Sequence, residues 1–157
     1  MSAGIVYLRP VPVARIRVFG PHGDAAREAW SRLFAWADRT RQRRRFERGF
    51  GLLFIAKGDG GSDRPGYDAC IELPEDIELD SAAGFVAHSL PGGAYMRARH
   101  RGPVEMLGES LRELRTVEAQ RRGLTVDPHR PLMEIYHTDA ELSGKPHRID
   151  LCVPVCF

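Results

Sequence analysis

The segment that decides the fold is Val13-Ala14-Arg15-Ile16-Arg17-Val18-Phe19-Gly20-Pro21. It alternates apolar and polar residues, as a strand does, and it ends in a Gly-Pro turn. The same plan returns 82 residues later as Tyr95-Met96-Arg97-Ala98-Arg99-His100-Arg101-Gly102-Pro103, and at this offset Asp68 and Cys70 match Asp150 and Cys152 without a gap. We therefore predict two copies of one pattern, at about residues 13–74 and 95–156.

Each copy has the order strand, helix, strand, strand. The first copy is predicted to contain strands within residues 4–19, a helix over about 24–39, and strands over 50–56 and 67–73. The second is predicted to contain a strand over 94–100, a helix over 104–121 and strands over 131–137 and 148–155, after a strand near 85–90. Strands joined by short loops pair antiparallel, and both helices then cover one side of the sheet. The predicted fold is a single α+β domain over residues 1–157, built from duplicated βαββ modules.

The composition is that of an ordinary globular chain. Of 157 residues, 43% are hydrophobic and 28% are charged, and the formal net charge is only +2, so no strong field favours nucleic acid or an anionic membrane. No apolar run approaches the roughly 20 residues of a membrane span, and we find no signal-peptide pattern. Three cysteines without a CxxC pair indicate a reducing cytoplasm, and we expect no metal or other cofactor.

A single carboxylate points to the functional site. At the offset of 82 residues, Glu134 matches Leu52, which lies in a segment that is apolar on both strand faces. A carboxylate in place of a sheltered leucine is costly unless it takes up a proton, pairs with a cation or faces a water-filled cavity. We therefore predict that Glu134 attracts a cationic ligand or acts as a general acid or base, with an ion pair to an arginine as the structural alternative.

Aromatic residues are candidates for the walls of the same site. Tyr136 shares a strand face with Glu134 because it lies two residues further on. Trp30 and Trp36 are six residues apart on the first predicted helix, so only one of them can face the cleft, and we favour Trp30. Three further candidates are Tyr95, Tyr67 and Phe19. For each of these aromatic residues, a place in the core is the alternative.

Six arginines crowd the ten residues 39–48. Such a run can contact phosphates, but it contains a single aromatic residue, Phe46, and no groove-reading motif. A solvated helix end and loop is the simpler interpretation, and a nucleic-acid partner is not expected. A contact with a protein partner stays open.

Several segments together carry a family resemblance. They are residues 95–103, the helix segment Glu28-Ala29-Trp30-Ser31-Arg32-Leu33-Phe34-Ala35-Trp36, the strand Tyr67-Asp68-Ala69-Cys70-Ile71, and the closing segments Glu134-Ile135-Tyr136 and Ile149-Asp150-Leu151-Cys152-Val153-Pro154-Val155. In this order they resemble the GyrI-like small-molecule-binding domains, which are also the effector-binding domains of AraC-type and multidrug-responsive regulators. The resemblance implies SHS2-like modules around a pseudo-twofold axis and a cleft between them for aromatic, often cationic, compounds. It also implies that Glu134 lies in that cleft.

The family pattern is incomplete in two places. His22 and Val104 follow the two Gly-Pro turns, where the family commonly has an aromatic residue. The regulators of the family also carry a helix-turn-helix, and the 12 residues that precede the first copy are too few to form one. We therefore do not expect a complete one-component transcription factor.

Three functions are compatible with this resemblance. The first is the binding or sensing of hydrophobic aromatic compounds in the cleft, with Glu134, Tyr136 and Trp30 as the main contacts. The second is hydrolysis of cyclopropane-containing DNA-alkylating toxins, with Glu134 as acid or base and Tyr136 orienting it. The third is a protein-interaction module, such as an inhibitor of DNA gyrase, with the arginine run as the contact.

Overall fold

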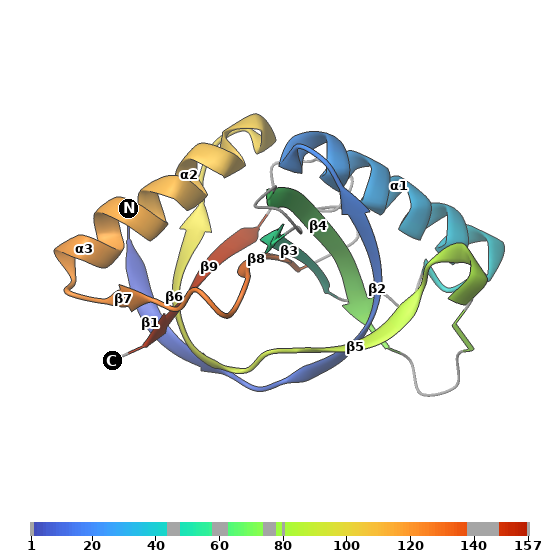
Figure 1. Ribbon diagram of the computed structural model, residues 1–157, viewed down its shortest axis with the longest axis horizontal. Helices are drawn as coiled ribbons and strands as arrows, with labels where there is room; N and C mark the ends of the chain where they lie inside the picture. Colours follow the sequence, from blue (N-terminus) through green and yellow to red (C-terminus); the bar gives the residue numbers. More distant parts are fainter. Residues whose placement is uncertain are drawn as a thin grey trace.

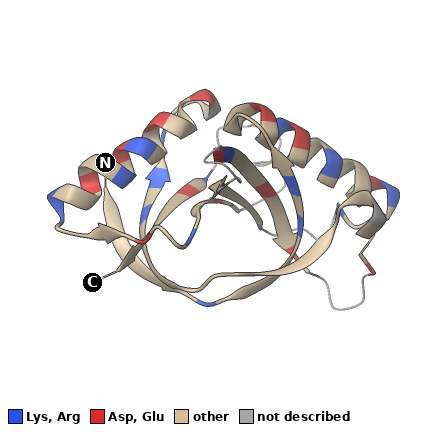
Figure 2. Cartoon of the chain, in the orientation of Figure 1, with Lys and Arg blue, Asp and Glu red and all other residues tan. Residues whose placement is uncertain are grey.

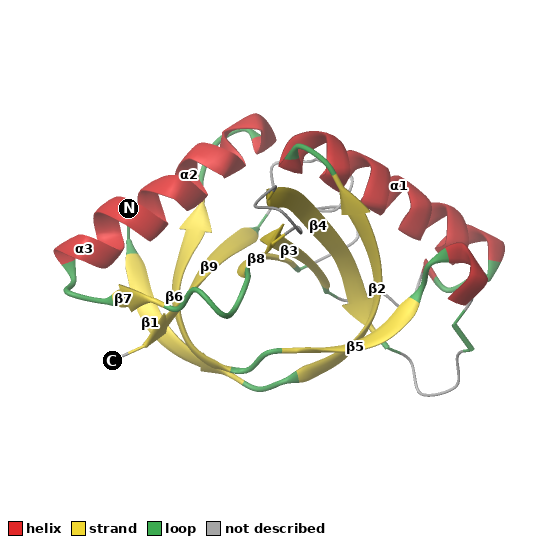
Figure 3. Ribbon diagram, viewed as in Figure 1, coloured by secondary structure: helices red, strands yellow, loops and turns green. Residues whose placement is uncertain are grey.

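The fold is a curled antiparallel sheet with two long helical segments on one side (Figures 1 and 3). The computed structural model describes residues 2–43, 48–57, 63–73, 78–79, 81–137 and 148–156. The predicted α+β class and the antiparallel sheet are confirmed. Figure 2 shows acidic and basic positions interspersed along both helical segments, as expected for their solvated faces.

The helices and strands lie close to their predicted positions. The first half contains β1 (Ala3–Leu8), β2 (Val11–Phe19), α1 (His22–Arg39), β3 (Gly49–Lys57) and β4 (Asp63–Glu72). The second contains η3 (Ser81–Ala83), β5 (Val86–Leu90), β6 (Gly93–His100), a helical segment over residues 104–121, β7 (Thr125–Val126), β8 (Leu132–Tyr136) and β9 (Ile149–Cys156). The short strand β7, which pairs with β9, was not predicted from the sequence.

The two halves meet at the centre of the sheet. The strand order is β1-β6-β9-β8-β3-β4-β2-β5, so β8 of the second half pairs with β3 of the first. The outer strands are exchanged, because β1 pairs with β6 and β5 pairs with β2. Any ligand site at the centre of the sheet is therefore built from both halves.

Two apolar clusters lie on opposite faces of the sheet. The larger one packs between the sheet and the helices and includes Leu33 and Trp36 of α1. The smaller one includes Leu52, Tyr95 and Met133. Because side chains alternate along a strand, the residue number decides which of the two clusters a side chain joins.

The second helical segment is irregular. It consists of η4 (Val104–Met106), α2 (Leu107–Glu113), the π-helical stretch η5 (Leu114–Glu118) and α3 (Ala119–Arg121). Regular helical spacing would place Met106 and Val117 on the apolar stripe of this segment, but these side chains are 41% and 55% exposed. The wider π turn changes the phase of the helix, and Glu118 and Ala119 are buried instead.

The strand ladders correct the alignment of the two halves at β3 and β8. Ala69 of β4 and Leu151 of β9 are 82 residues apart, and their partners are Gly51 and Glu134. The equivalent residue of Glu134 is therefore Gly51, at an offset of 83. Leu52 lies on the opposite sheet face, in the smaller cluster, so its match with Glu134 is wrong. The second half has one more residue between helix and strand, and a shift of one residue turns the side chains to the other face.

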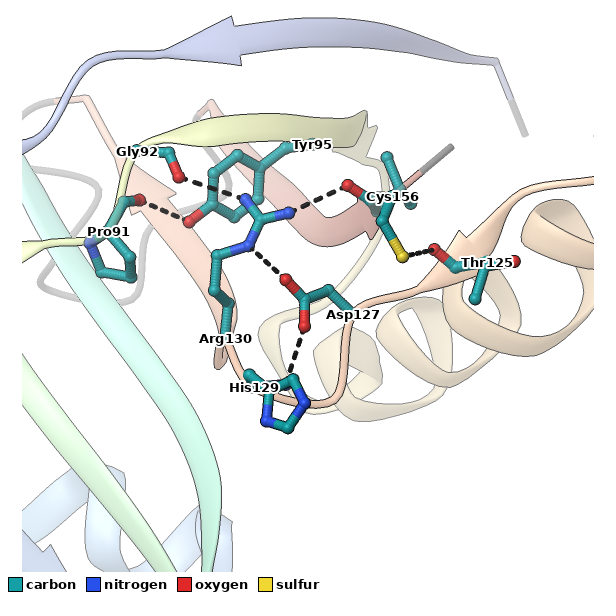
Figure 4. A network of polar contacts seen from close by, with 9 residues as sticks. Pro91, Gly92, Tyr95, Thr125, Asp127, His129, Arg130 and Cys156 are labelled. Carbon is teal, nitrogen blue, oxygen red and sulfur yellow. Dashed lines mark hydrogen bonds and ion pairs between the residues drawn. The ribbon is translucent and has the colours of Figure 1, made fainter.

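Arg130 ties the ends of two strands to the loop before β8 (Figure 4). Its guanidinium donates hydrogen bonds to the Asp127 carboxylate at 2.8 Å, the Gly92 carbonyl at 3.2 Å and the Val155 carbonyl at 2.9 Å. The same group lies 4.8 Å from the centre of the Tyr95 ring. These contacts hold the start of β6 and the end of β9 in place around that loop.

Gly51 allows the Tyr67 side chain to lie directly over the backbone of β3. A Cβ atom at Gly51 would lie 1.9 Å from the Tyr67 hydroxyl and 2.6 Å from Glu134 Oε1. Both distances are well inside van der Waals contact, so any side chain at this position must displace the tyrosine or the carboxyl group.

The substitution Gly51→Ala should therefore lower the free energy of unfolding by about 2 kcal/mol or more, because it displaces a buried hydrogen-bonded group. Urea unfolding measures this change. The matched control is Gly4→Ala in β1, where a Cβ atom meets nothing within 4 Å, and its stability should be unchanged or slightly higher. Equal stability of the two variants would contradict the close packing of Tyr67 on Gly51.

Candidate functional site

Glu134 is buried under the first helix. It lies on β8, its residue is 6% exposed, and it faces the helix-covered side of the sheet. Leu132 and Tyr136 flank it on the same strand face and pack against the larger cluster. The sequence prediction that Glu134 is sheltered among apolar residues is thus confirmed, although its equivalent is Gly51 and not Leu52.

Four side chains join in one hydrogen-bonded group, which we call the Glu134 cluster: Trp30, Tyr67, Glu134 and Tyr136. The Tyr67 hydroxyl donates to Glu134 Oε1 at 2.7 Å, and the Tyr136 hydroxyl donates to the same oxygen at 3.1 Å. Trp30 Nε1 donates to the Tyr67 hydroxyl at 2.9 Å. The Trp30 ring also meets the Tyr136 ring edge-on, with 5.6 Å between centroids.

The carboxyl group of Glu134 is held by hydroxyl groups and by no arginine. Within the described chain, its side chain forms no ion pair, so the alternative of an arginine salt bridge is wrong. Burial raises the pKa of Glu134, while the hydrogen bonds from Tyr67 and Tyr136 act in the opposite direction. Burial likewise raises the pKa of both tyrosines, so they remain hydroxyl donors. Burial is the larger effect, so the pKa of Glu134 lies above its ordinary value.

The structure separates the two tryptophans, as the helical spacing predicted. Trp36 is 2% exposed and stacks on Phe85 with 4.8 Å between ring centroids. It belongs to the core. Trp30 is half-buried and joins the Glu134 cluster.

Tyr95 and Phe19 do not join the cluster, and the prediction that groups them with Glu134 is wrong. Tyr95 lies in the smaller apolar cluster on the opposite face, and its hydroxyl donates to the Pro91 carbonyl at 2.6 Å. Phe19 lies at the end of β2, edge-on to Phe54, with 6.1 Å between centroids. Both residues have odd numbers in strands whose even-numbered residues face the helices. Which face of a strand meets the helices follows from the pairing of the strands, so alternation in the sequence alone does not show it.

A cavity of about 940 Å³ lies between the two halves. It starts beside Leu53 and Leu132, where β8 begins, and it follows β3 toward Ile55. Residues from both halves line it: positions 52–55 of β3, positions 108, 111, 112 and 115 of the second helical segment, and positions 126–132 of the loop before β8. Leu53 and Leu132, which line the cavity, are strand neighbours of the Glu134 cluster, whose four members do not line it.

Four residues of the second helical segment that line this cavity were not predicted from the sequence. They are Gly108, Leu111, Arg112 and Arg115. The sequence places a glycine and two arginines three and four residues apart, beside the leucines of an apolar stripe. Charged residues beside an apolar stripe are usual on a surface helix, so this pattern does not distinguish a cavity lining from an ordinary solvated face.

His100 and the described part of the arginine run are not among the residues that line the cavity. His100 Nε2 donates a hydrogen bond to the Pro103 carbonyl at 2.9 Å, and Nδ1 lies 2.9 Å from the Ser110 hydroxyl, so the side chain holds the turn after β6. Of the arginine run, residues 44–47 lie outside the described residues, and Arg43 lies over the Phe34 ring at 4.2 Å. The described residues contain no metal-binding group and no helix able to cross a membrane.

The pKa shift of Glu134 predicts a pH-dependent stability. The folded state holds the proton of Glu134 more tightly than the unfolded chain does. The protonated carboxyl group therefore adds to the free energy of unfolding. This contribution is fully present below the ordinary glutamate pKa of about 4.3 and is lost as pH rises through the folded-state pKa. Relative to Glu134→Gln, the wild type should lose at most about 1.4 kcal/mol per pH unit in this interval. Urea unfolding between about pH 4 and about pH 8 measures the difference.

The control for this experiment is Glu28→Gln, because Glu28 is exposed on α1 and pairs with Arg32. Its stability should follow the wild type across the pH range. Parallel curves for the wild type and Glu134→Gln would show that burial does not shift this carboxyl group.

Solved structures share this fold over almost the whole chain. The EcmrR C-terminal domain aligns with a TM-score of 0.68 and 12% identity, covering 99% of this chain and 97% of that chain. A hydrolase encoded by lin2189 from Listeria innocua aligns at 0.65 and 15%, covering 98% and 91%. SAV2435 bound to tetraphenylphosphonium aligns at 0.64 and 14%, covering 99% and 94%. At such identities, these similarities establish the fold alone.

Sequence comparison gives the family. No curated protein matches this chain. The GyrI-like small molecule binding domain matches residues 1–155, which is nearly the whole sequence, and the curled sheet with two helices agrees with it. The chain belongs to the family of GyrI-like small molecule binding domains.

Proposed function

We propose that this protein binds apolar aromatic small molecules in the cavity between its two halves. The observation that carries the proposal is the cavity itself. Its volume of about 940 Å³ lies at the upper end of the range for small-molecule sites. Its floor is apolar, with Leu53, Leu111 and Leu132 from three different elements. We also propose that residues 1–157 form one domain of two SHS2-like βαββ modules, which places the cavity on the axis between them.

The Glu134 cluster forms the inner end of this proposed site. Trp30, Tyr67 and Tyr136 are held by hydrogen bonds and ring contacts, and Leu132 and Leu53 are the neighbouring strand residues that line the cavity. A ligand that displaced these leucines would meet aromatic faces and a carboxyl group with a raised pKa. We assign Trp30, Tyr67, Glu134 and Tyr136 to the site on this basis.

The family supports the proposal in its general form. GyrI-like domains are small-molecule-binding domains, and the similar structure of SAV2435 holds tetraphenylphosphonium, an aromatic compound. The neutral dye N-phenyl-1-naphthylamine is a suitable probe, because its fluorescence rises when it leaves water for an apolar site.

The variant Gly108→Phe tests the cavity. A Cβ atom at Gly108 meets nothing within 4 Å, so a phenyl group can enter the cavity without straining the helix. We expect dye affinity to fall at least about tenfold, because the ring occupies the ligand's volume. The control Gly4→Phe, in β1 with open space around it, should bind as the wild type does. Unchanged affinity in Gly108→Phe would place the dye elsewhere.

A second candidate function is hydrolysis of cyclopropane-containing DNA-alkylating toxins. Two observations favour it: Glu134 is a buried acid with a raised pKa next to two hydroxyl groups, and a similar structure from Listeria innocua is named a hydrolase. The carboxyl group would give a proton to one carbon of the strained ring as its bond to the neighbouring carbon breaks. Water would add to that neighbouring carbon and return a proton to Glu134.

Mass spectrometry separates this reaction from simple binding. Hydrolysis yields a product heavier than the toxin by one water, whereas binding returns the toxin unchanged. Glu134→Gln should abolish the product, while Glu28→Gln should leave it at the wild-type level. Product formation by Glu134→Gln, or an unchanged toxin with the wild type, would exclude Glu134 as the catalytic acid.

A further inference from the structure

The charges around the cavity are not balanced. Four arginines and two aspartates line it, so its walls carry a net charge of +2 when the histidines are neutral. Both aspartates are engaged by arginines already. Asp68 accepts two hydrogen bonds from Arg17, at 2.7 and 2.9 Å, and Asp127 accepts one from Arg130 at 2.8 Å. The positive excess therefore belongs to the other two arginines.

Those two arginines are Arg112 and Arg115 on the second helical segment. Both are exposed and both line the cavity. Within the described chain, neither guanidinium has a hydrogen bond or an ion pair. They are three residues apart on one helix face, where two like charges repel each other. A bound anion would relieve this repulsion and would accept hydrogen bonds from both guanidinium groups.

An anionic group can reach them without losing contact with the apolar floor. Gly108 lies one helical turn before Arg112 and leaves open space beside it. Leu111 lies next to Arg112 and faces the same cavity, as does Leu132 across from it. The site thus offers an apolar surface and a pair of guanidinium groups within one cavity.

Glu134 does not offset this positive charge. It is 6% exposed and is not among the residues that line the cavity. Its hydrogen bonds also come from hydroxyl groups inside the protein. The carboxyl group that suggested a cationic ligand from the sequence is therefore separated from the cavity where a ligand has room.

We propose that the preferred ligands of this cavity are amphipathic aromatic acids, carboxylates or sulfonates, with the ring system on the leucine floor and the acid group at Arg112 and Arg115. This inference rests on the proposed function, because it assumes that the cavity takes up apolar small molecules. It adds the charge of the ligand class, and it differs in this from the cation that the similar structure of SAV2435 holds.

Two dyes that differ by one acid group test the proposal. The probes are 8-anilinonaphthalene-1-sulfonate and N-phenyl-1-naphthylamine, which share a ring system and differ in the sulfonate. We expect the wild type to bind the sulfonate at least about fivefold more tightly, and this preference should weaken as salt is added. The double variant Arg112→Gln, Arg115→Gln should lose the preference and keep its affinity for the neutral dye.

A third probe and a control variant complete the experiment. Tetraphenylphosphonium should compete with the neutral dye more effectively in the double variant than in the wild type, because two repelling charges are gone. Arg39→Gln, an exposed arginine of α1 outside the cavity, should retain the sulfonate preference. A preference that persists in the double variant, or one that is absent from the wild type, overturns the proposal.

The outcomes distinguish this proposal from the one on which it rests. If the neutral dye binds and Gly108→Phe displaces it, the cavity is a binding site, and the sulfonate preference alone decides the ligand charge. If Gly108→Phe displaces neither dye, the proposed function fails together with this inference.

Discussion

The pairing of β3 with β8 is the contact on which the site depends. It joins the two halves of the chain and places Gly51 directly opposite Glu134. Because Gly51 has no side chain, Tyr67 can reach over β3 and donate its hydroxyl to Glu134. A shift of one residue in this ladder would turn Glu134 to the other face of the sheet, away from Trp30 and the helices. The register of two strands therefore decides whether the cluster exists.

The general fold could be predicted from the sequence, and this register could not. Alternation and helical spacing are local properties, so they located β2, α1 and their counterparts closely. The constant offset of 82 residues failed at β8 because one additional residue precedes it, in a connection where sequence similarity gives no warning. Glu134 was identified correctly as buried, although the reason given, its match to Leu52, was wrong. The face of Tyr95 could not be predicted either, because it follows from pairing between distant strands.

The two halves differ in the side chains at matched positions of their helices and strands. Trp30 of α1 corresponds at 82 residues to Arg112 of the second helical segment, and Tyr67 of β4 corresponds to Ile149 of β9. On the first side, two large rings close over Glu134 and leave it 6% exposed. On the second side, an arginine extends into solvent and the space beside it remains open. The first half thus contributes two rings that close over Glu134, whereas the matched helix of the second half borders the open cavity.

This difference changes which charge controls ligand choice. A carboxylate attracts a cation strongly only where the cation can approach within a few ångströms, and Glu134 is buried and does not line the cavity. Burial also raises the pKa of Glu134. The guanidinium groups of Arg112 and Arg115, in contrast, line the cavity directly. The cavity should therefore favour anions, because Arg112 and Arg115 are accessible to a ligand and the buried Glu134 is not.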